Sequence, residues 1–346
     1  MQKKLHITTS IFILFLAVCF CLLSSSRAQQ SQSAENLGSN YRLSGPYTHK
    51  NLTVFLVHGK DLLKGHSFLT LQEALAQKKV VVYETKDVNE LSIKNFSNQD
   101  IYVQSGDIVR GGDQDRMIST DFIVPPKSGR MPIAAFCVES GRWSQRGGEE
   151  NGSFHSSDNS ASTKELKLAA KRSNSQQEVW ENVSLTQAKL SKNVGQTVNS
   201  TLSRSSLELS VENAKVKESA AAYINALTNI VRDKTDVIGY AFAINGQLNS
   251  ADVYASSELF LKLWPKLLKA SATEAIAGLQ DGQKPLAVEQ QAVTAFLTDS
   301  EKPEAAAKDV TERVNVVTKE DNRGIFFETR DKQKNGAWIH RNYIRK

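Results

Sequence analysis

The stretch Thr53-Val54-Phe55-Leu56-Val57-His58 is a run of β-branched, aromatic and aliphatic residues that predicts a buried strand. Short strands follow it closely, separated by Gly, Pro, Asn and Asp residues that are typical of turns. They are predicted at 80–83, 91–96, 100–103, 117–124 and 132–138. Strands this close together leave no room for helical crossovers, so the sheet is predicted to be largely antiparallel.

In the middle of the chain, the spacing of apolar residues changes from that of strands to that of helices. Ser175 and Glu178 have the spacing of a capping box, and an apolar stripe follows them. A second helix is predicted over 207–231 from apolar residues three and four positions apart. A strand pair over 238–254 comes next, with Asn245-Gly246 at its turn. We therefore predict an α+β fold, with a largely antiparallel β-sheet core and a long helical segment packed on it.

Two further helices, one of them over 286–297, and two C-terminal strands complete the predicted fold. The other helix is indicated by the stripe Phe260, Leu263, Trp264, Leu267 and Leu268. We predict one α+β domain over residues 45–300, because the strand pair at 238–254 needs the sheet of the first half to join. Residues 301–346 are predicted to be a linker and a C-terminal β-hairpin.

Residues 1–28 have the three parts of a cleavable signal peptide. Lys3 and Lys4 precede an uncharged apolar run at 11–23, and Ser26-Arg27-Ala28 places small residues at the cleavage positions. The run is shorter than the roughly 20 residues of a membrane span, and an uncleaved anchor is the alternative. We expect a secreted or periplasmic protein with no membrane span after signal cleavage.

The mature chain has few cysteines and a modest charge. Residues 29–44 are rich in Ser, Gln, Asn and Gly and predict a disordered leader. Loss of Lys3, Lys4 and Arg27 with the signal lowers the formal charge by three, from +6 to +3. This balance does not favour nucleic acid as a partner. Only Cys137 remains after cleavage, so the core must hold the fold without an internal disulfide.

The stretch Gln-Ser-Gly-Asp-Ile-Val-Arg-Gly-Gly-Asp-Gln-Asp-Arg at 104–116 is predicted to be a loop between strands. Glycine lets a backbone approach a ligand closely, and arginine binds phosphate or carboxylate through two parallel hydrogen bonds. Aspartate oxygens suit hard cations. The candidate ligand-binding residues here are Asp107, Gly111, Gly112, Gln114, Asp115 and Arg116. The alternative is a solvated hairpin turn, where Gly and Asp serve the backbone alone.

The stretch Cys-Val-Glu-Ser-Gly-Arg-Trp at 137–143 adds Glu139, Arg142 and Trp143 to the candidate ligand-binding residues. If Cys137 faces inward, Glu139 lies on the same side of the strand and needs a cationic partner. Because the connection from the preceding strand is short, Arg116 is predicted to lie next to Glu139 or Arg142. The result is either a polar pocket walled by Trp143 or a structural ion pair covered by it.

Cys137 lies at the start of a short loop that ends in Arg142. This order of a cysteine and an arginine is also found in rhodanese and phosphatase sites. No helix is predicted after these two residues, and the charge of Glu139 would raise the thiol pKa rather than lower it. A cysteine in an apolar strand usually behaves as a small hydrophobic residue. We therefore expect Cys137 to be buried and unreactive.

Three segments together resemble a known domain family. They are Gly-Gly-Asp-Gln-Asp-Arg at 111–116, Cys-Val-Glu-Ser-Gly-Arg-Trp at 137–143 and Tyr-Ala-Phe-Ala-Ile-Asn-Gly at 240–246. The family is named for its association with ADP-ribosylglycohydrolases and with rhodanese and phosphatase superfamily proteins. The resemblance covers roughly residues 46–277 and leaves the C-terminal hairpin outside. Because the name describes neighbouring proteins, it implies no enzyme class.

Two functions remain open from the sequence. The first is an exported protein that binds an unknown ligand or partner through the loop at 104–116 and the segment at 137–143. The second is a secreted hydrolase of a phosphate- or ribose-containing substrate, with Asp107, Asp113, Asp115 or Glu139 as acid, base or metal ligand. A hydrolase needs ionisable groups that converge on an open cleft. The histidines are isolated from one another, so no metal site is predicted, and no cofactor is indicated.

Overall fold

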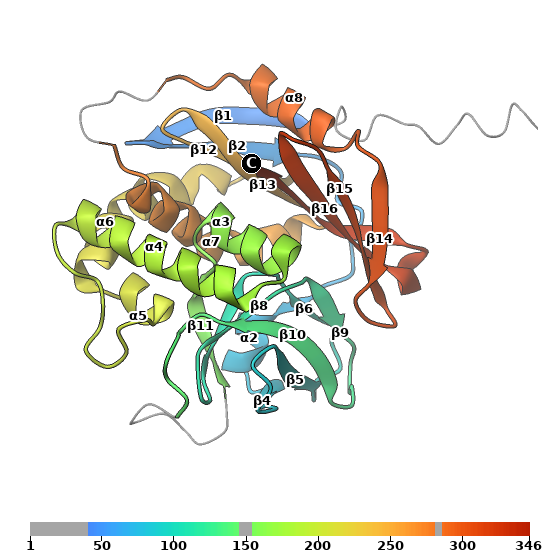
Figure 1. Cartoon of the computed structure of the whole chain (residues 1–346). Coiled ribbons are helices and arrows are strands. Elements are labelled where there is room, and N and C mark those ends of the chain that lie inside the picture. The colour runs from blue at the N-terminus through green and yellow to red at the C-terminus, as the bar shows by residue number, and fades with distance from the viewer. Residues whose placement is uncertain (1–40, 145–153, 281–285) are drawn as a thin grey trace, which may run out of the picture. The chain divides into compact units, whose positions relative to one another are not determined.

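The computed structural model describes residues 41–144, 154–280 and 286–346 of the chain. These residues form a mixture of helices and strands with large antiparallel sheets, which confirms the α+β class. In the larger sheet every neighbouring pair of strands is antiparallel. From edge to edge its eight strands are β1 (Arg42–His49), β2 (Leu52–His58), β12 (Val237–Ile244), β13 (Gln247–Tyr254), β17 (Ala337–Arg345), β16 (Gly324–Asp331), β15 (Val314–Glu320) and β14 (Ala305–Asp309) (Figure 1).

Most remaining strands lie together in a second, strand-rich part of the fold. The antiparallel six-stranded sheet has the order β11 (Phe154–Ser160), β7 (Asp107–Gly111), β8 (Arg116–Ile118), β10 (Met131–Cys137), β5 (Glu90–Asn95) and β4 (Val80–Glu84). A small sheet consists of β3 (Leu69–Thr70), β6 (Ile101–Val103) and β9 (Phe122–Val124). Only the β3–β6 pair is parallel among the strands described.

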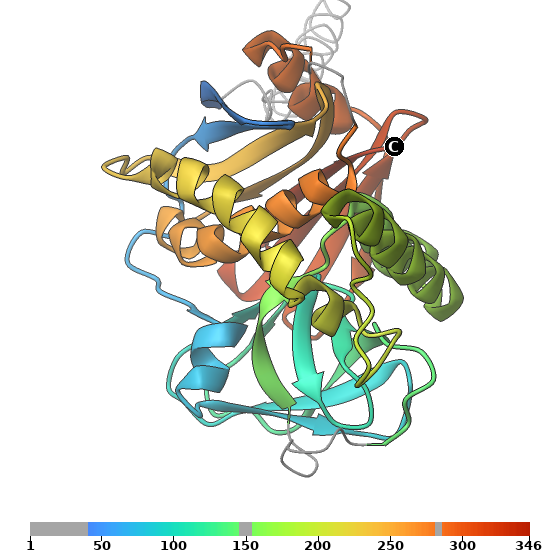
Figure 2. The same ribbon diagram turned by 90° about the vertical axis from the view of Figure 1, so that its left-hand side faces the viewer.

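The helices cover both faces of the eight-stranded sheet (Figures 1 and 2). The helices and helical turns of the described residues are α2 (Leu71–Ala76), α3 (Lys164–Leu168), the π-helical turn η2 (Ala169–Ser173), α4 (Gln176–Val194), α5 (Leu207–Val211), α6 (Ala214–Leu227), the 3-10 turn η3 (Thr228–Val231), α7 (Ser257–Ala277), α8 (Gln290–Ser300) and the 3-10 turn η4 (Lys332–Lys334). Helix α2 packs in the strand-rich part rather than on this sheet. Helices α6 and α7 pack on one face, and α8 packs on the other.

The continuous apolar run of β2 follows from burial on both faces. Val54 and Leu56 belong to the core shared with α6 and α7. Phe55 and Val57 belong to the core under α8. A strand covered on both sides has no solvent face, so it lacks the alternation of a half-exposed strand.

The helix boundaries agree with the capping signals but not with one long helical segment. Ser175 accepts a hydrogen bond from the backbone N–H of Glu178 at 3.2 Å and starts α4. The helix predicted over 207–231 is interrupted, because Asn213 caps a new helix, α6. Helix α7 runs unbroken through Pro265 and is the longest helix described.

Three strand predictions need correction. The strand predicted at 117–124 is divided into β8 and β9, which belong to different sheets. Strand β7 occupies part of the predicted loop at 104–116, because Ile108 and Val109 are buried and pair with β8. The polar segment at 154–160, where no strand was predicted, forms β11, which pairs with β7. Its composition gives no strand pattern, because polar residues occupy buried positions (Ser157 and Asn159) as well as exposed ones (His155 and Asp158).

The two ends of the predicted domain also differ from the structure. Strand β1 begins at Arg42, so the end of the predicted leader is part of the sheet, whereas residues 1–40 lie outside the described residues. The C-terminal hairpin is present as β16 and β17. It is not an appendage, because β17 also pairs with β13. The expected linker contains β14, which pairs with β15.

Buried charges connect the eight-stranded sheet to the strand-rich part. His340 of β17 lies between Asp121, which precedes β9, and Asp252 of β13. Arg313, which precedes β15, pairs with Asp100 beside β6 and also with Asp331 of β16. These contacts fix the position of the strand-rich part through specific ion pairs as well as through apolar packing.

Candidate functional site

The two segments predicted to form a site do meet. Strands β8 and β10 pair antiparallel, with Arg116 directly opposite Cys137. The backbone N–H of Val138 donates to the carbonyl oxygen of Asp115 at 3.0 Å. The backbone N–H of Asp115 in turn donates to Glu139 Oε2 at 3.3 Å. The predicted contact between the Gly-rich segment and the segment at 137–143 is therefore confirmed.

An enclosed network of charges forms where these segments meet. Arg142 Nη2 lies 2.8 Å from Glu139 Oε2 and 3.8 Å from Asp115 Oδ1. Both acidic residues are fully buried. Arg142 also donates to the carbonyl oxygen of Gly112, and Gly111 N–H donates to Asp115 Oδ1 at 3.1 Å. Gly112 has a φ of 55°, and a Cβ there would collide with the Phe154 ring. The geometry suits a rigid turn more than an open ligand site.

Arg116 does not pair with Glu139, contrary to the prediction. Its guanidinium donates to Glu84 Oε1 at 3.2 Å, to the carbonyl oxygen of Val88 and to Cys137 Sγ. Arg116 lies opposite Cys137 in the strand register, and its side chain reaches Glu84 at the end of β4 and Val88 in the segment after it. Glu139 lies beyond the end of β10 and finds Arg142 instead.

The remaining sequence candidates lie in different environments. Asp107 pairs with Lys266 of α7 at 2.7 Å and accepts the backbone N–H of Gln104. Trp143 is 56% exposed, so it does not cover the ion pair as expected. Gln114 is fully buried, and its side-chain oxygen and nitrogen have no hydrogen-bond partner in the part of the chain that the structure describes.

Cys137 is buried, as predicted. Burial raises the pKa of its thiol to about 11. The charge of Arg116 opposes this rise, and the charges of Glu84 and Glu139 add to it. The thiol is therefore protonated at neutral pH, and the thiolate that a nucleophile needs is scarce.

Labelling with an aromatic disulfide reagent is expected to modify Cys137 slowly in the native protein. A pKa near 11 leaves roughly a hundredfold less thiolate than in an ordinary cysteine, and burial slows access further. Mass spectrometry of the peptide that contains Cys137 would follow the reaction, with the protein in urea as the reactive control. Equal labelling rates in native and unfolded protein would contradict a buried, protonated thiol.

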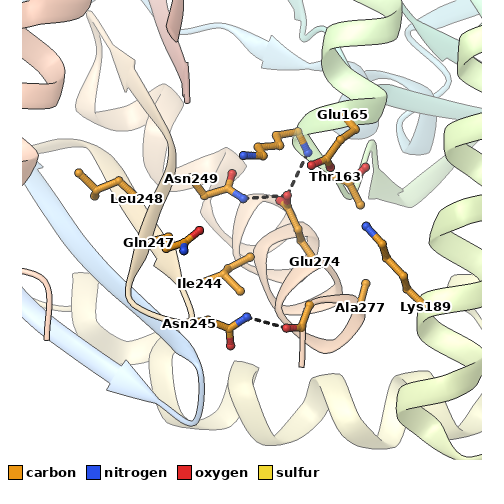
Figure 3. A pocket seen from close by; sticks show the side chains of 12 residues that line it. Thr163, Glu165, Lys189, Ile244, Asn245, Gln247, Leu248, Asn249, Glu274 and Ala277 are labelled. Atoms are coloured by element: carbon orange, nitrogen blue, oxygen red, sulfur yellow. Dashed lines mark hydrogen bonds between the residues drawn. The ribbon is translucent and has the colours of Figure 1, made fainter. Parts of the chain in front are cut away.

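A second candidate site is a pocket of about 170 Å³ between α7, α4, the start of α3 and the β12–β13 hairpin (Figure 3). Glu274 of α7 and Asn249 of β13 point toward one another in it. Asn245 and Gly246 have φ values of 54° and 78° and make the tight hairpin turn. Asn245 Nδ2 donates to the carbonyl oxygen of Gly278 and so ties this turn to the end of α7.

Glu274 is the principal charged group of this pocket and is only 7% exposed. Its Oε1 accepts the backbone N–H of Lys164 at 3.0 Å and Asn249 Nδ2 at 2.8 Å. Burial raises the pKa of Glu274, and the nearby charge of Lys167 opposes this shift. The buried Asn249 Oδ1 has no hydrogen-bond partner among the residues described. Both hydrogen bonds of Glu274 go to its Oε1, so its Oε2 can accept from a ligand beside Asn249.

Sequence reasoning missed this pocket because the apolar stripe that predicted the helix ended at Leu268, and Glu274 lies beyond it. Glu274 follows Leu267 by seven positions, so it continues the buried stripe of α7. A carboxylate on an apolar stripe is costly to bury and is a recognisable signal of a partner or a ligand. The distant Asn249 could be paired with it only once the fold was known.

Comparison with known families supports the resemblance seen in the sequence. Residues 40–344 match the model of the ARG and Rhodanese-Phosphatase-superfamily-associated Protein domain, ARPP-1. The chain belongs to this family. The ARPP-1 match extends past residue 277 and includes the C-terminal hairpin that the sequence resemblance left outside. No curated protein and no solved structure matches this ARPP-1 chain.

Proposed function

We propose that this chain is an exported binding protein whose ligand places a positively charged or hydrogen-bond-donating group in the Glu274 pocket. The observation that supports this most strongly is Asn249 Oδ1, a buried acceptor without a partner among the described residues, beside the Glu274 carboxylate, whose two hydrogen bonds both go to Oε1. A buried acceptor without a donor costs free energy, and a ligand that supplies donors recovers it. An ammonium group has three donors and a charge opposite to that of Glu274.

Export is part of this proposal on the basis of the first 28 residues alone. Lys3 and Lys4, the apolar run at 11–23 and the small residues near Ala28 support a cleavable signal and a secreted or periplasmic location. In the part of the chain that the structure describes, no helix is both long enough and apolar enough to cross a bilayer.

Binding through the Gly-rich segment and the segment at 137–143 has less support than binding in the Glu274 pocket. In its favour, the two segments meet, and Trp143 offers an exposed ring beside them. Against it, Asp115 and Glu139 are fully buried and close to Arg142. A ligand would have to open this network before it reached either carboxylate.

The hydrolase alternative has weaker support still. A hydrolase needs two ionisable groups that converge on an open cleft. Of the acids named for it, Asp115 and Glu139 are enclosed, and Asp107 is paired with Lys266. We therefore favour binding over catalysis.

Ethylamine is expected to bind the wild-type protein with a dissociation constant of about millimolar, since a few non-hydrogen atoms supply only about 4 kcal/mol. Glu274→Gln should weaken this binding by about tenfold, because a charge-assisted hydrogen bond is lost. Nuclear magnetic resonance titration measures both. Glu178→Gln changes an exposed carboxylate on α4 outside the pocket lining and serves as the matched control.

The same titration should depend on pH in a defined direction. Glu274 binds a cation only when ionised, and burial raises its pKa, with Lys167 opposing and Glu165 adding to the shift. Affinity should therefore fall as the pH drops through this raised pKa, above the range of an ordinary glutamate. Ethylamine binding that is equal in wild type and Glu274→Gln would contradict the proposed function.

A further inference from the structure

The Glu274 pocket also holds a positive charge that the proposed cation would leave unused. Lys189 extends from α4 into the pocket, toward Glu274 and Thr163 (Figure 3). In the described ranges, Lys189 makes neither an ion pair nor a side-chain hydrogen bond, so its ammonium does not neutralise Glu274. Opposite charges that face one pocket without touching leave room for a group between them.

We infer that the ligand is a small zwitterion, namely a free α-amino acid with a short neutral side chain. This inference rests on the proposed function. The ammonium group of the ligand donates to Asn249 Oδ1, which has no partner among the described residues, and to Glu274 Oε2, since both hydrogen bonds of Glu274 go to Oε1. Its carboxylate accepts from Lys189, which lies across the pocket. Each charge of the ligand then meets an opposite charge, which offsets the cost of removing both from water.

The size and walls of the pocket narrow the ligand further. A pocket of about 170 Å³ is smaller than the roughly 300–1,000 Å³ of sites for drug-sized ligands. Ile244 and Ala277 add apolar surface between the charged groups, where a short side chain would pack (Figure 3). The two other charged residues of the lining, Lys164 and Glu165, have opposite charges, so together they do not favour a ligand side chain of either charge.

Titration of the full chain with three probes tests the inference. L-alanine has both charged groups, ethylamine lacks the carboxylate, and N-acetyl-L-alanine lacks the ammonium group. L-alanine is expected to bind about five- to tenfold more tightly than ethylamine, as a partly exposed ion pair with Lys189 would provide. N-acetyl-L-alanine is expected to bind at least about tenfold more weakly than L-alanine, since it has no cation for Glu274.

Lys189→Ala should reduce L-alanine affinity to that of ethylamine and leave ethylamine affinity unchanged. Lys192→Ala removes an exposed lysine from the same helix outside the pocket lining and is the matched control. If L-alanine and ethylamine bind equally and Lys189→Ala changes neither, the zwitterion inference is overturned while the proposed amine site stands. If neither amine binds, or if Glu274→Gln affects neither, the proposed function itself fails and the inference fails with it.

Discussion

Replacing Arg313 by alanine is expected to lower the free energy of unfolding by about 3–5 kcal/mol, because two carboxylates would lose their cation inside the protein. Arg313 Nη1 lies 2.5 Å from Asp100 Oδ1, and its Nη2 lies 2.7 Å from Asp331 Oδ2. Its Nε also donates to Asp331 at 3.0 Å. The side chains of all three residues are at most 8% exposed. Few single changes elsewhere would leave two such charges uncompensated.

Urea unfolding of the wild type and of Arg313→Ala measures this loss. Arg172→Ala is the matched control, because Arg172 pairs with Glu320 at the surface, where the two side chains are 50% and 31% exposed. Exposed pairs of this kind contribute about 0–1 kcal/mol. A loss for Arg313→Ala no larger than for Arg172→Ala would show that water or side-chain movement compensates the two aspartates.

The second large effect concerns His340, and His340→Gln should cost about 3 kcal/mol near pH 6. His340 Nδ1 lies 2.8 Å from Asp121 Oδ2, and Nε2 lies 3.0 Å from Asp252 Oδ1. Its ring stacks on Tyr254 with centroids 4.4 Å apart. Burial alone would lower the pKa of His340, but the two aspartates outweigh burial and raise it. Glutamine keeps some hydrogen bonding and removes the charge.

The cost of His340→Gln should depend on pH. A raised folded-state pKa means that the stabilising contribution of His340 is complete below its unfolded pKa of about 6.5 and is lost as the pH rises through the folded value. The difference between wild type and variant should therefore shrink from about pH 7 upward. Lys171 and His340 lower the pKa of Asp121 although burial opposes this shift. The stabilising contribution of the Asp121 carboxylate is therefore lost only in acid.

Denaturant unfolding at several pH values from about 6 to 9 would measure this difference. The exposed His155 gives a control, since His155→Gln should change stability little at any of these values. A difference that stays constant across the range would indicate that His340 does not change its charge there, and the ion-pair explanation would then be wrong.

Local rules predicted much of the strand-rich part. The closeness of residues 116–118 and 131–137 in the sequence favoured the antiparallel contact between the Gly-rich segment and the segment at 137–143, although only β8 of the strand predicted at 117–124 pairs with β10. The same reasoning predicted that Cys137 would be buried, because an apolar strand next to a sheet neighbour has an inward face. Both predictions depended on neighbours in the sequence.

Long-range partners could not be predicted in this way. The partner of Arg116 is Glu84 of β4, although Glu139 was closer in the sequence. Asp107 pairs with Lys266, 159 residues away. A hydrophobic pattern shows which face of an element is buried, but it does not show which distant element will cover that face. For the same reason, the pairing of Glu274 with Asn249 and the place of β17 beside β13 emerged only from the fold.

The order of strands in the eight-stranded sheet has a consequence for how the chain reaches its native state. His58 at the end of β2 and Asp236 before β12 are in contact although 178 residues separate them, and β17, at the other end of the chain, lies between β13 and β16. Contacts of such high sequence separation carry a large loop-closure entropy and slow folding. A chain synthesised from its N-terminus cannot complete this sheet until its last strand is available. The nascent chain is therefore expected to stay open until late, which would suit the export proposed above if the chain crosses the membrane unfolded.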